Sequence, residues 1–371
     1  MGPVNAIAAV THPDPYPYYA ELVAQRPLHR DDALGLWIAA SAAAVRAVLT
    51  SDLCRVRPKA EPVPRQLLGS AAGDIFGQLV RMTDGPGHLP AKVAVSGHLG
   101  SMNPALTVQR GAACARELVE ELEPSGHAER LAAFAFRLPV YVIGSLLGFA
   151  PDRLPQLAAW TGDFVRCLAP ASTPEQIEQG KEAASHLAEA FATLLGRPVL
   201  DAVVANRIGY LSQAYEATAG LIGNTIVALG RQGDVRDRVG SERGFLTAVI
   251  REVVRHDPPV QNTRRFLARP GNVAGQDMNE DDTVLVVLAA ANRDPSANPN
   301  PERFDPLRRE RLTFTFGLGT HACPGETLAT IVTQAGVEQL LAAGVEPEPL
   351  VETVTYRPSA NTRIPLFRPP D

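Results

Sequence analysis

One cysteine, Cys323, lies in a segment that also holds aromatic residues, glycines and a histidine. The segment reads Phe-Thr-Phe-Gly-Leu-Gly-Thr-His-Ala-Cys-Pro-Gly-Glu over residues 314–326, and a helical pattern follows it. Pro324 suits the first helical position, where a missing N–H group costs nothing. Backbone N–H groups at a helix N-terminus stabilise negative charge, so we expect the pKa of Cys323 to be lowered. A thiolate on such a loop is a soft ligand for a metal ion.

Other residues of this segment suit a flat ligand that carries negative charge. Gly317 and Gly319 let the backbone turn tightly and approach the ligand closely. Phe316 can cover one side of the sulfur, and His321 can reach an anionic group. The alternative is an inert, buried cysteine after a glycine-rich turn, since free cysteine is among the most buried residue types. The complete Phe-x-x-Gly-x-His-x-Cys-x-Gly pattern favours a ligand.

This pattern resembles the haem-binding loop of the cytochrome P450 family. The resemblance runs from about residue 14 to residue 363 and is strongest after residue 210. It implies that Cys323 is the iron ligand of haem b (iron protoporphyrin IX), and that Phe316, Gly317, His321 and Gly325 contact the cofactor.

The resemblance also assigns residues to the two propionates of the haem. Arg265 takes the place of an arginine that binds one propionate, and a guanidinium offers planar, permanently charged donors to a carboxylate. Without the cysteine loop, Arg265 would read as a solvated arginine on an edge strand. His88 and Lys92 take the places of a histidine and an arginine that bind the other propionate from one side of a helix. A lysine there lacks the fork of an arginine.

Residues 213–224 resemble the helix that lies on the oxygen side of the haem in this family. Glu216 takes the place of the acid that relays protons. At the next position, where most relatives have a hydroxyl, this chain has Ala217, and Thr218 lies about 100° further round the helix and cannot simply substitute. The alanine is explained by helix packing alone, by a proton supplied from substrate or water, or by a reaction other than plain hydroxylation.

Family positions also imply a substrate pocket. The segment 151–206, which would cover this pocket, is short beside typical members. The expected lining residues are Phe76, Phe164, Gln213, Ala214, Ala217, Val260, Asn262, Phe266 and Ala360.

Glu252 and Arg255 are neighbours on one face of a predicted helix, and by themselves they read as a surface ion pair of a few tenths of a kcal/mol. With Arg303 they resemble the Glu-x-x-Arg triad that braces the fold of this family behind the haem loop.

Composition and periodicity set the expected architecture. We predict helices at 18–25, 42–49, 109–121, 138–147, 174–195, 208–231, 243–256 and 326–343, and strands at 36–39, 262–268, 284–288 and near the C-terminus. No linker or charge block divides the 371 residues. The expected fold is therefore mainly α, a single large helical domain over residues 1–371 with a small β lobe, and the resemblance identifies it as the cytochrome P450 fold.

Charge and cysteine usage exclude several classes of protein. The net charge is −5 with interspersed signs, which does not suggest nucleic-acid binding. The four cysteines lie far apart, which argues against a zinc site, an iron–sulfur cluster or a disulfide framework and fits a reducing cytoplasm. The start of the chain lacks a basic region with a long apolar run, and no segment approaches the roughly 18 apolar residues of a membrane helix. We expect a cytoplasmic protein without membrane contact.

The resemblance implies a haem-thiolate monooxygenase that inserts one oxygen atom from O2 into a small or medium organic substrate, in secondary metabolism. Two alternatives remain open: an oxidative coupling or ring-forming enzyme without net oxygen insertion, and a non-enzymatic haem-based gas sensor. The chain holds no nucleotide fingerprint or ferredoxin-type cysteine cluster, so electrons must come from a donor, by resemblance a ferredoxin with its reductase. The basic residues expected to dock this donor, or else to form a solvated loop, are Lys92, Arg308, Arg309 and Arg311.

Overall fold

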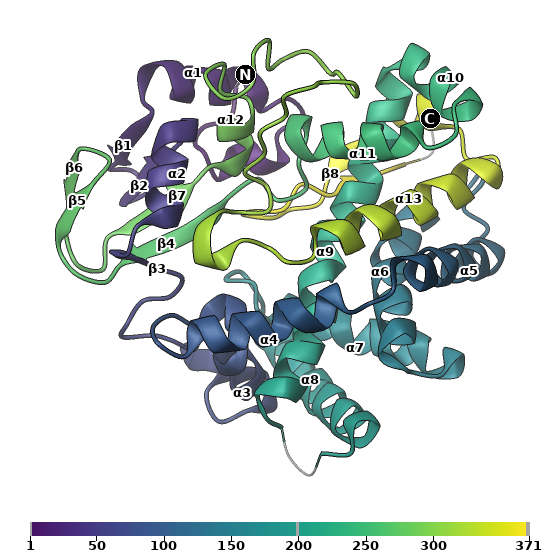
Figure 1. The fold of residues 1–371 in the computed structure, drawn as a ribbon, viewed down its shortest axis with the longest axis horizontal. Helices are drawn as coiled ribbons and strands as arrows, with labels where there is room; N and C mark the ends of the chain where they lie inside the picture. The colour runs from purple at the N-terminus through teal and green to yellow at the C-terminus, as the bar shows by residue number, and fades with distance from the viewer. Residues whose placement is uncertain (1, 198–199, 369–371) are drawn as a thin grey trace.

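A long central helix, α9 (Ala202–Arg231), runs through the molecule (Figure 1). The Asp201 carboxylate caps it by accepting hydrogen bonds from the N–H groups of Val203 and Val204. The computed structural model describes residues 2–197 and 200–368. The other α-helices in these ranges are α1 (Tyr16–Gln25), α2 (Ala42–Thr50), α3 (Ala71–Gln78), α4 (His88–Gly100), α5 (Pro104–Leu122), α6 (Arg130–Leu147), α7 (Leu154–Cys167), α8 (Pro174–Leu195), α10 (Gly233–Ser241), α11 (Phe245–His256), α12 (Leu288–Asn292), α13 (Glu326–Ala342) and α14 (Pro347–Leu350).

A small sheet lies at one side of these helices (Figure 1). Its strand order is β1-β2-β7-β4-β3; β2 and β7 pair in parallel and the other neighbours are antiparallel. Two hairpins, β5 with β6 and β8 with β9, complete the β structure. The strands are β1 (Leu28–Asp31), β2 (Leu36–Ala39), β3 (Cys54–Arg55), β4 (Thr263–Leu267), β5 (Gly271–Val273), β6 (Gln276–Met278), β7 (Thr283–Val286), β8 (Thr355–Tyr356) and β9 (Pro365–Leu366). The predicted mainly α fold with a small β lobe is confirmed.

Most of the predicted elements are found, with shifted ends. The helix 174–195 and the strand 36–39 have the predicted bounds, and the helix start is fixed by a capping box between Thr173 and Gln176. Helix α11 begins at Phe245 rather than at residue 243, because Gly244 precedes it in the left-handed region with φ 84°. Helix α13 begins at Glu326, so Pro324 lies before the helix and not at its first position.

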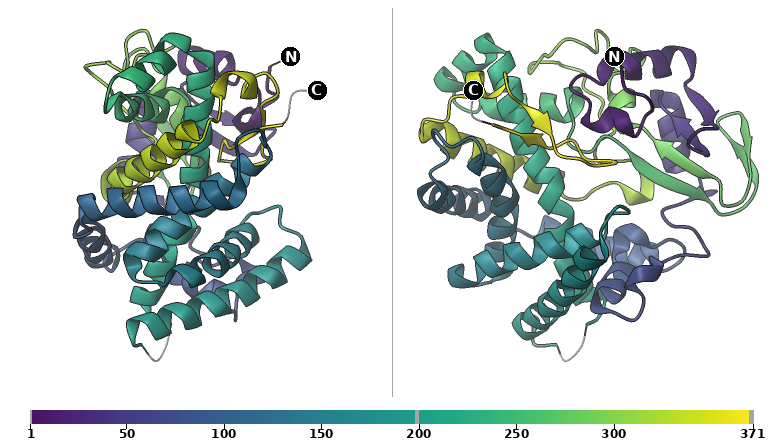
Figure 2. Two further views of the ribbon diagram at one scale, coloured as in Figure 1. Left: turned by 90° about the vertical axis from the view of Figure 1, so that its right-hand side faces the viewer. Right: turned by 180° about the vertical axis from the view of Figure 1, so that it is seen from behind.

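One helix in the described ranges, α6, is long and apolar enough to cross a membrane by length and composition. The expectation that no segment approaches this length is therefore wrong. More than half of α6 is buried, and it packs against α5, α7 and α9, as Figure 2 also shows. We therefore interpret α6 as a core helix.

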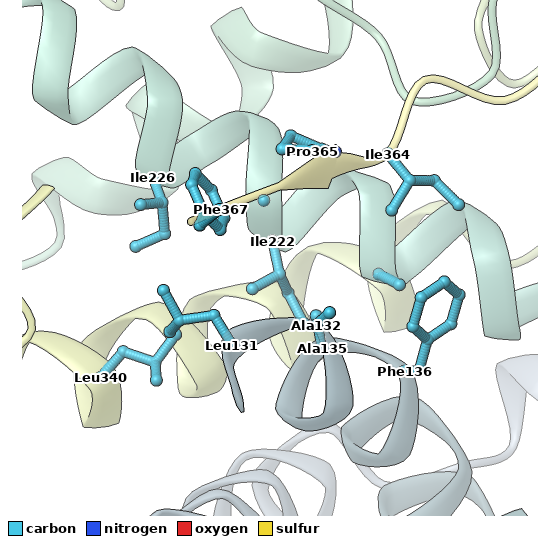
Figure 3. Close-up of a pocket in the computed structure, with 12 residues that line it drawn as sticks. Leu131, Ala132, Ala135, Phe136, Ile222, Ile226, Leu340, Ile364, Pro365 and Phe367 are labelled. Carbon is cyan, nitrogen blue, oxygen red and sulfur yellow. The ribbon is translucent and has the colours of Figure 1, made fainter. Parts of the chain in front are cut away.

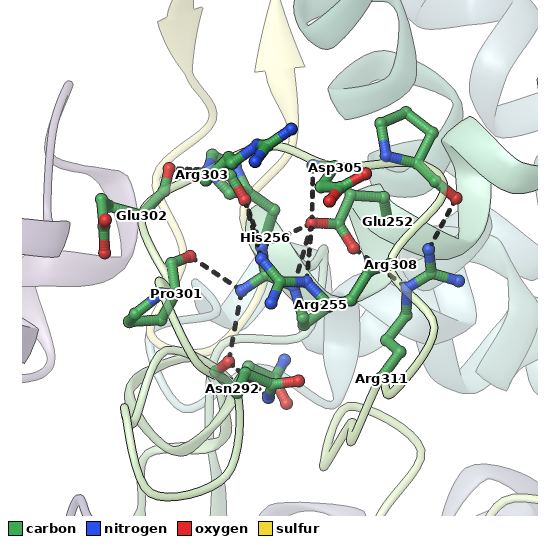
Figure 4. Close-up of polar contacts among 12 residues, drawn as sticks. Glu252, Arg255, His256, Asn292, Pro301, Glu302, Arg303, Asp305, Arg308 and Arg311 are labelled. Carbon is green, nitrogen blue, oxygen red and sulfur yellow. Dashed lines mark hydrogen bonds and ion pairs between the residues drawn. The ribbon is translucent and has the colours of Figure 1, made fainter.

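A buried ion network joins α11 to the segment that leads into the cysteine loop (Figure 4). The side chains of Glu252 and Arg255 are fully buried, with 2.6 Å between Arg255 Nη2 and Glu252 Oε1. The other carboxylate oxygen accepts from Arg311 Nε at 2.9 Å, and Arg308 Nε lies 3.6 Å from Oε1. The prediction that the Arg303 side chain completes this network is wrong. Only the carbonyl oxygen of Arg303 takes part, and it accepts a hydrogen bond from Arg255 Nη2.

This network also corrects the expected docking patch. Arg308 and Arg311 are engaged with Glu252, and their side chains are mostly buried. They hold the chain just before Phe314 in place rather than forming a solvated loop.

Candidate active site

The cysteine loop is a closed turn ahead of α13. The N–H group of Cys323 donates to Phe316 O at 2.7 Å, and the N–H group of Gly317 donates to Phe314 O at 2.8 Å. Gly317 and Gly319 have φ values of 69° and 68°, so both positions need the conformational freedom that glycine provides. The N–H group of Gly325 points at the sulfur, 3.4 Å from Cys323 Sγ.

The environment of Cys323 combines solvent exposure with desolvation of the sulfur. This desolvation raises the pKa of the thiol and outweighs the Gly325 N–H group and the Lys92 charge, which lower it. The expected lowering of the pKa is therefore wrong for the free thiol, since the helix begins beyond Pro324. Coordination to a metal ion deprotonates such a thiol outright.

Two histidines and an aspartate meet beside this loop. His88 at the start of α4 and His321 lie with ring centroids 4.2 Å apart. His88 Nε2 lies 3.1 Å from Thr320 O, and His321 Nε2 lies 3.1 Å from Asp84 Oδ1. Burial raises the pKa of Asp84, but hydrogen bonds from His321 and from the Val56 N–H group lower it by more. The pKa of Asp84 is therefore below its usual value. Burial lowers the pKa of His321, which favours its neutral form.

Arg265 on β4 acts on this pair through its charge, which adds to burial in lowering the pKa of His321. Arg265 is 7% exposed, and its guanidinium donates to Arg264 O at 2.9 Å and to Thr263 Oγ1 at 3.5 Å, neither of them a carboxylate. A buried guanidinium without a carboxylate partner is an unusual arrangement, because burying a charge is costly unless it is paired.

The donor set fits the cofactor that the sequence implies. Among the described residues, His88 Nδ1 and His321 Nδ1 are buried without a hydrogen-bond partner. Each ring donates from Nε2, so its Nδ1 donates to an anion only when the ring carries a second proton, which a bound carboxylate would favour. In that form the two histidines, with the Arg265 guanidinium, suit the propionates of a haem, while the Cys323 sulfur suits its iron.

Lys92 contributes differently from the prediction. Its ammonium group donates a short hydrogen bond to Ala322 O, and its charge acts on Cys323. Burial lowers the pKa of Lys92. In this structure Lys92 therefore supports the cysteine loop, and its half-buried ammonium group is engaged there rather than free to dock an electron donor.

The middle of α9 forms a second wall of accessible residues. Residues 213–217 keep part of their surface accessible, whereas residues 208–212 before them and 218–227 after them are buried. The accessible stretch holds Gln213, Ala214, Glu216 and Ala217, while Thr218 is 2% exposed. We call this partly accessible stretch, residues 213–217, the open wall of α9.

Glu216 is not a free acid. Its Oε1 atom accepts from Arg357 Nη1 at 2.9 Å, and both side chains are about one quarter to one third exposed, at 25% and 31%. Arg357 follows β8, and its guanidinium also lies over the Phe136 ring, 5.2 Å from the centroid. The C-terminal hairpin thus places a cation on the central helix.

The remaining predicted pocket residues divide into two groups. Val260, Phe266 and Ala360 are partly accessible. Phe76, Phe164 and Asn262 are buried: Phe164 packs in the helical core, Phe76 lies under the Arg57 guanidinium, and Asn262 Nδ2 donates to Ala360 O. We leave these three out of the proposed pocket lining, because packed side chains leave no surface for a substrate.

A separate apolar crevice lies between α6, α9, α13 and β9 (Figure 3). Its volume is about 10 Å³, which is the room of roughly one water molecule. It is a packing defect and no substrate site.

Sequence reasoning missed Arg357 and the role of Asp84 as a partner of His321. No local pattern marks Arg357, because it meets Glu216 across 141 residues of chain. Asp84 does precede His88 in the motif that the sequence shows, and a carboxylate close to a buried histidine commonly accepts a hydrogen bond from its ring.

The helical fold and the donor set of the site fit a haem protein, and the comparisons show its family. Residues 226–343 match the cytochrome P450 family model. Cytochrome P450 monooxygenase PikC of Streptomyces venezuelae is 29% identical over 351 residues, covering 88% of this chain and 83% of that protein. The 6-deoxyerythronolide B hydroxylase of Saccharopolyspora erythraea is 26% identical over 378 residues, covering 92% of each.

Solved structures show the same fold. CalO2 superposes with a TM-score of 0.78 at 24% identity, covering 100% of this chain and 99% of that one. P450BioI, in complex with an acyl carrier protein that bears hexadec-9Z-enoic acid, has a TM-score of 0.79 at 21% identity and covers 95% and 96%. The chain belongs to the cytochrome P450 family. It is an oxidoreductase of a family that carries haem, and the alternative of a non-enzymatic gas sensor is set aside.

Proposed function

We propose that this protein is a haem-thiolate monooxygenase that inserts one oxygen atom from O2 into a small or medium organic substrate of secondary metabolism. The observation that carries the proposal is the accessible Cys323 on the loop that also holds His321, which together with His88 has a buried ring nitrogen without a hydrogen-bond partner. Two relatives named as a monooxygenase and a hydroxylase support it.

When bound, haem b supplies the activation of O2 at its iron, and the protein supplies ligation, orientation and a dry space. Cys323 would ligate the iron, with the Gly325 N–H group donating to the sulfur. His88, His321 and Arg265 would hold the propionates. Phe316 would cover one side of the sulfur, and the tight turn at Gly317 would let the backbone approach the cofactor.

Substrate and protons reach the opposite wall, formed by α9. Ala214, Ala217 and Gln213 line this wall, with Val260, Phe266 and Ala360 around it. Glu216 moves protons from solvent, which requires that its carboxylate exchange the Arg357 contact for water. Ala217 offers no hydroxyl, so water or the substrate completes the relay.

Electrons come from a ferredoxin and its reductase, and the protein acts in the cytoplasm without nucleic acid or membrane as a partner. Of the basic residues considered for docking the ferredoxin, Arg309 is the one left available. Lys92, Arg308 and Arg311 make contacts within the protein.

Ala217 favours a second candidate function, in which the enzyme joins two positions of the substrate by oxidative coupling. The mass of the product separates the two functions: a gain of one oxygen atom supports insertion, and a loss of two hydrogen atoms without added oxygen supports coupling.

The haem-thiolate assignment is tested by the spectrum of the reduced protein with carbon monoxide. We expect the strongly red-shifted Soret band of thiolate ligation in the parent protein and its loss in Cys323→Ser. A matched control is Cys114→Ala, because Cys114 is a buried thiol on α5 whose pKa is raised by burial to about 11. An unshifted band in the parent protein would contradict the assignment.

A further inference from the structure

A cavity separate from the crevice of Figure 3 lies between the loop that follows β3, the end of α3 and the segment that leads into α4 (Figure 1). Its volume is about 420 Å³, which is within the roughly 300–1,000 Å³ of small-molecule sites. None of the described residues that line it belongs to α9 or to the cysteine loop. The cavity is therefore a site apart from the open wall of α9.

Basic side chains outnumber acidic ones in the lining of this cavity. Arg55, Arg57 and Lys59 line it, against one acid, Asp84. The Asp84 carboxylate is already engaged, because Oδ1 lies 3.1 Å from His321 Nε2 and Oδ2 accepts from a backbone N–H group at 2.9 Å. Asp84 thus holds the cysteine loop and makes no ion pair with either arginine.

Lys59 has a carboxylate partner of its own, but Arg55 has none. Lys59 Nζ lies 3.1 Å from Glu280 Oε1, outside the cavity lining. Arg55 is half-buried, and in the part of the chain that the structure describes its guanidinium makes neither a hydrogen bond nor an ion pair. Its positive charge and its donors are therefore available to a ligand in the cavity.

Arg57 is held in place without being neutralised. Its guanidinium lies over the Phe76 ring, 5.2 Å from the centroid, and Nη2 donates to Glu61 O at 2.8 Å. Its Nε atom is buried and has no hydrogen-bond partner among the described residues. A ring and a carbonyl oxygen orient this guanidinium, yet neither supplies a negative charge.

Two unneutralised guanidinium groups on one cavity determine the kind of ligand that fits. A half-buried cation costs free energy unless an anion pairs with it. A carboxylate supplies one negative charge, whereas a phosphate monoester supplies about −1.5 to −2 at neutral pH and three acceptor oxygens, which suit the planar fork of arginine. We propose that this cavity binds a phosphate monoester, whose phosphate group contacts Arg55 and Arg57.

The cavity also has room for the organic part of such a ligand. A phosphate group fills only part of the 420 Å³, and Pro58, Pro62 and Met82 add apolar surface to the lining. A small apolar group attached to the phosphate can contact these side chains. The inference goes beyond the proposed function, since it names a second binding site and no chemical step.

The test is equilibrium dialysis of the haem-loaded protein at neutral pH and low salt with phenyl phosphate, benzoate and inorganic phosphate. We expect phenyl phosphate to bind about tenfold or more tightly than benzoate, because it adds a charge-assisted contact to the second arginine. It should also bind more tightly than inorganic phosphate, which lacks the apolar ring. Arg55→Gln removes the preference over benzoate, whereas Arg55→Lys keeps part of it.

Arg55 is the residue to replace, because its guanidinium makes no contact within the described chain whose loss would disturb the loop. The matched control is Arg65→Gln, in the same connecting segment, because the Arg65 side chain is 85% exposed and does not line the cavity. It should leave all three affinities unchanged.

Four results would overturn the inference. Phenyl phosphate binds no more tightly than benzoate, or its preference survives in Arg55→Gln. Inorganic phosphate binds as tightly as phenyl phosphate, which would indicate a site for the free ion. Purified Arg55→Gln loses haem, which would assign Arg55 to the cofactor site. Dialysis needs neither turnover nor the carbon monoxide band, so these results leave the proposed function to its own test.

Discussion

Glu216 and Ala217 are adjacent on the open wall of α9 but have opposite capacities. The carboxylate of Glu216 accepts and releases protons, and it is held by Arg357 at 2.9 Å. The methyl group of Ala217 does neither, although its surface is partly accessible. In the proposed proton relay, the Glu216 carboxylate must therefore first leave this ion pair.

A hydroxyl at position 217 should change how electrons are used. In Ala217→Thr the partly open site accepts the larger side chain, and the hydroxyl donates to a ligand or back to the carbonyl one turn earlier. We expect the ratio of product formed to reducing equivalents consumed to rise, measured with a competent electron donor.

Ala217→Val is the control, because valine has the shape of threonine without the hydroxyl. If Thr and Val give the same ratio, then the alanine affects packing alone and proton supply does not limit the reaction.

The sequence predicts single residues best where their partners are close along the chain. The loop around Cys323 consists of consecutive residues, so its glycines, its histidine and its cysteine could be recognised as candidate site residues from the pattern. Arg357 was not found, since it acts on Glu216 across 141 residues of chain. The Arg303 assignment failed for a related reason: Arg303, Arg308 and Arg311 share one loop, and only packing decides which guanidinium reaches Glu252.

Helices α7 and α8 lie in the segment that is short beside typical family members, and they pack very closely. A Cβ atom at Gly180 on α8 would lie 2.2 Å from Cys167 Cβ and 2.9 Å from Asp163 O on α7. The contact requires glycine at this position, even though glycine lowers helix stability.

Gly180→Ala should therefore destabilise the protein. Overpacking of this kind costs about 1–3 kcal/mol, which exceeds the roughly 0.5–1 kcal/mol that alanine contributes inside a helix. We expect a lower midpoint of thermal unfolding for the haem-loaded variant.

Gly97→Ala on α4 is the matched control, because nothing lies within 4 Å of a Cβ atom at that helical position. Its midpoint should equal or exceed that of the parent protein. A rise for Gly180→Ala as well would mean that α7 and α8 separate easily.

The helices that sequence reasoning missed differ in how much signal they carry. In α7 the buried residues Leu154, Leu157, Ala158, Thr161 and Phe164 follow helical spacing, so a pattern was present. Helix α10 buries only Val235 and has no apolar stripe to detect. Helix α3 contains glycines that weaken any helical propensity, and one of them, at position 73, packs directly against the chain at Leu67.

The two ends of the described chain meet at one buried cation. Arg363 is 1% exposed and donates to Asp257 Oδ1 at 2.9 Å and to the carbonyl oxygens of Val10, His12 and Pro13 at 3.1, 2.7 and 3.0 Å. Asp257 ends α11, so three distant segments share one guanidinium. We infer from this closure that residues 1–371 fold as a single domain. Sequence alone predicts the absence of a linker but not the residue that joins the ends.

Replacing this cation should loosen the N-terminal segment first. Arg363→Met keeps the length of the side chain but leaves the Asp257 carboxylate and three carbonyl groups without their donor, and breaking a buried pair in this way costs about 3–5 kcal/mol. We expect faster amide hydrogen exchange over residues 8–16 and a lower midpoint of denaturant unfolding.

Arg368→Met, five residues further along and exposed, is the control and should exchange like the parent protein. If Arg363→Met leaves exchange in the N-terminal segment unchanged while other regions loosen, then the N-terminus is held by its own packing and the two ends of the chain are not coupled through Arg363.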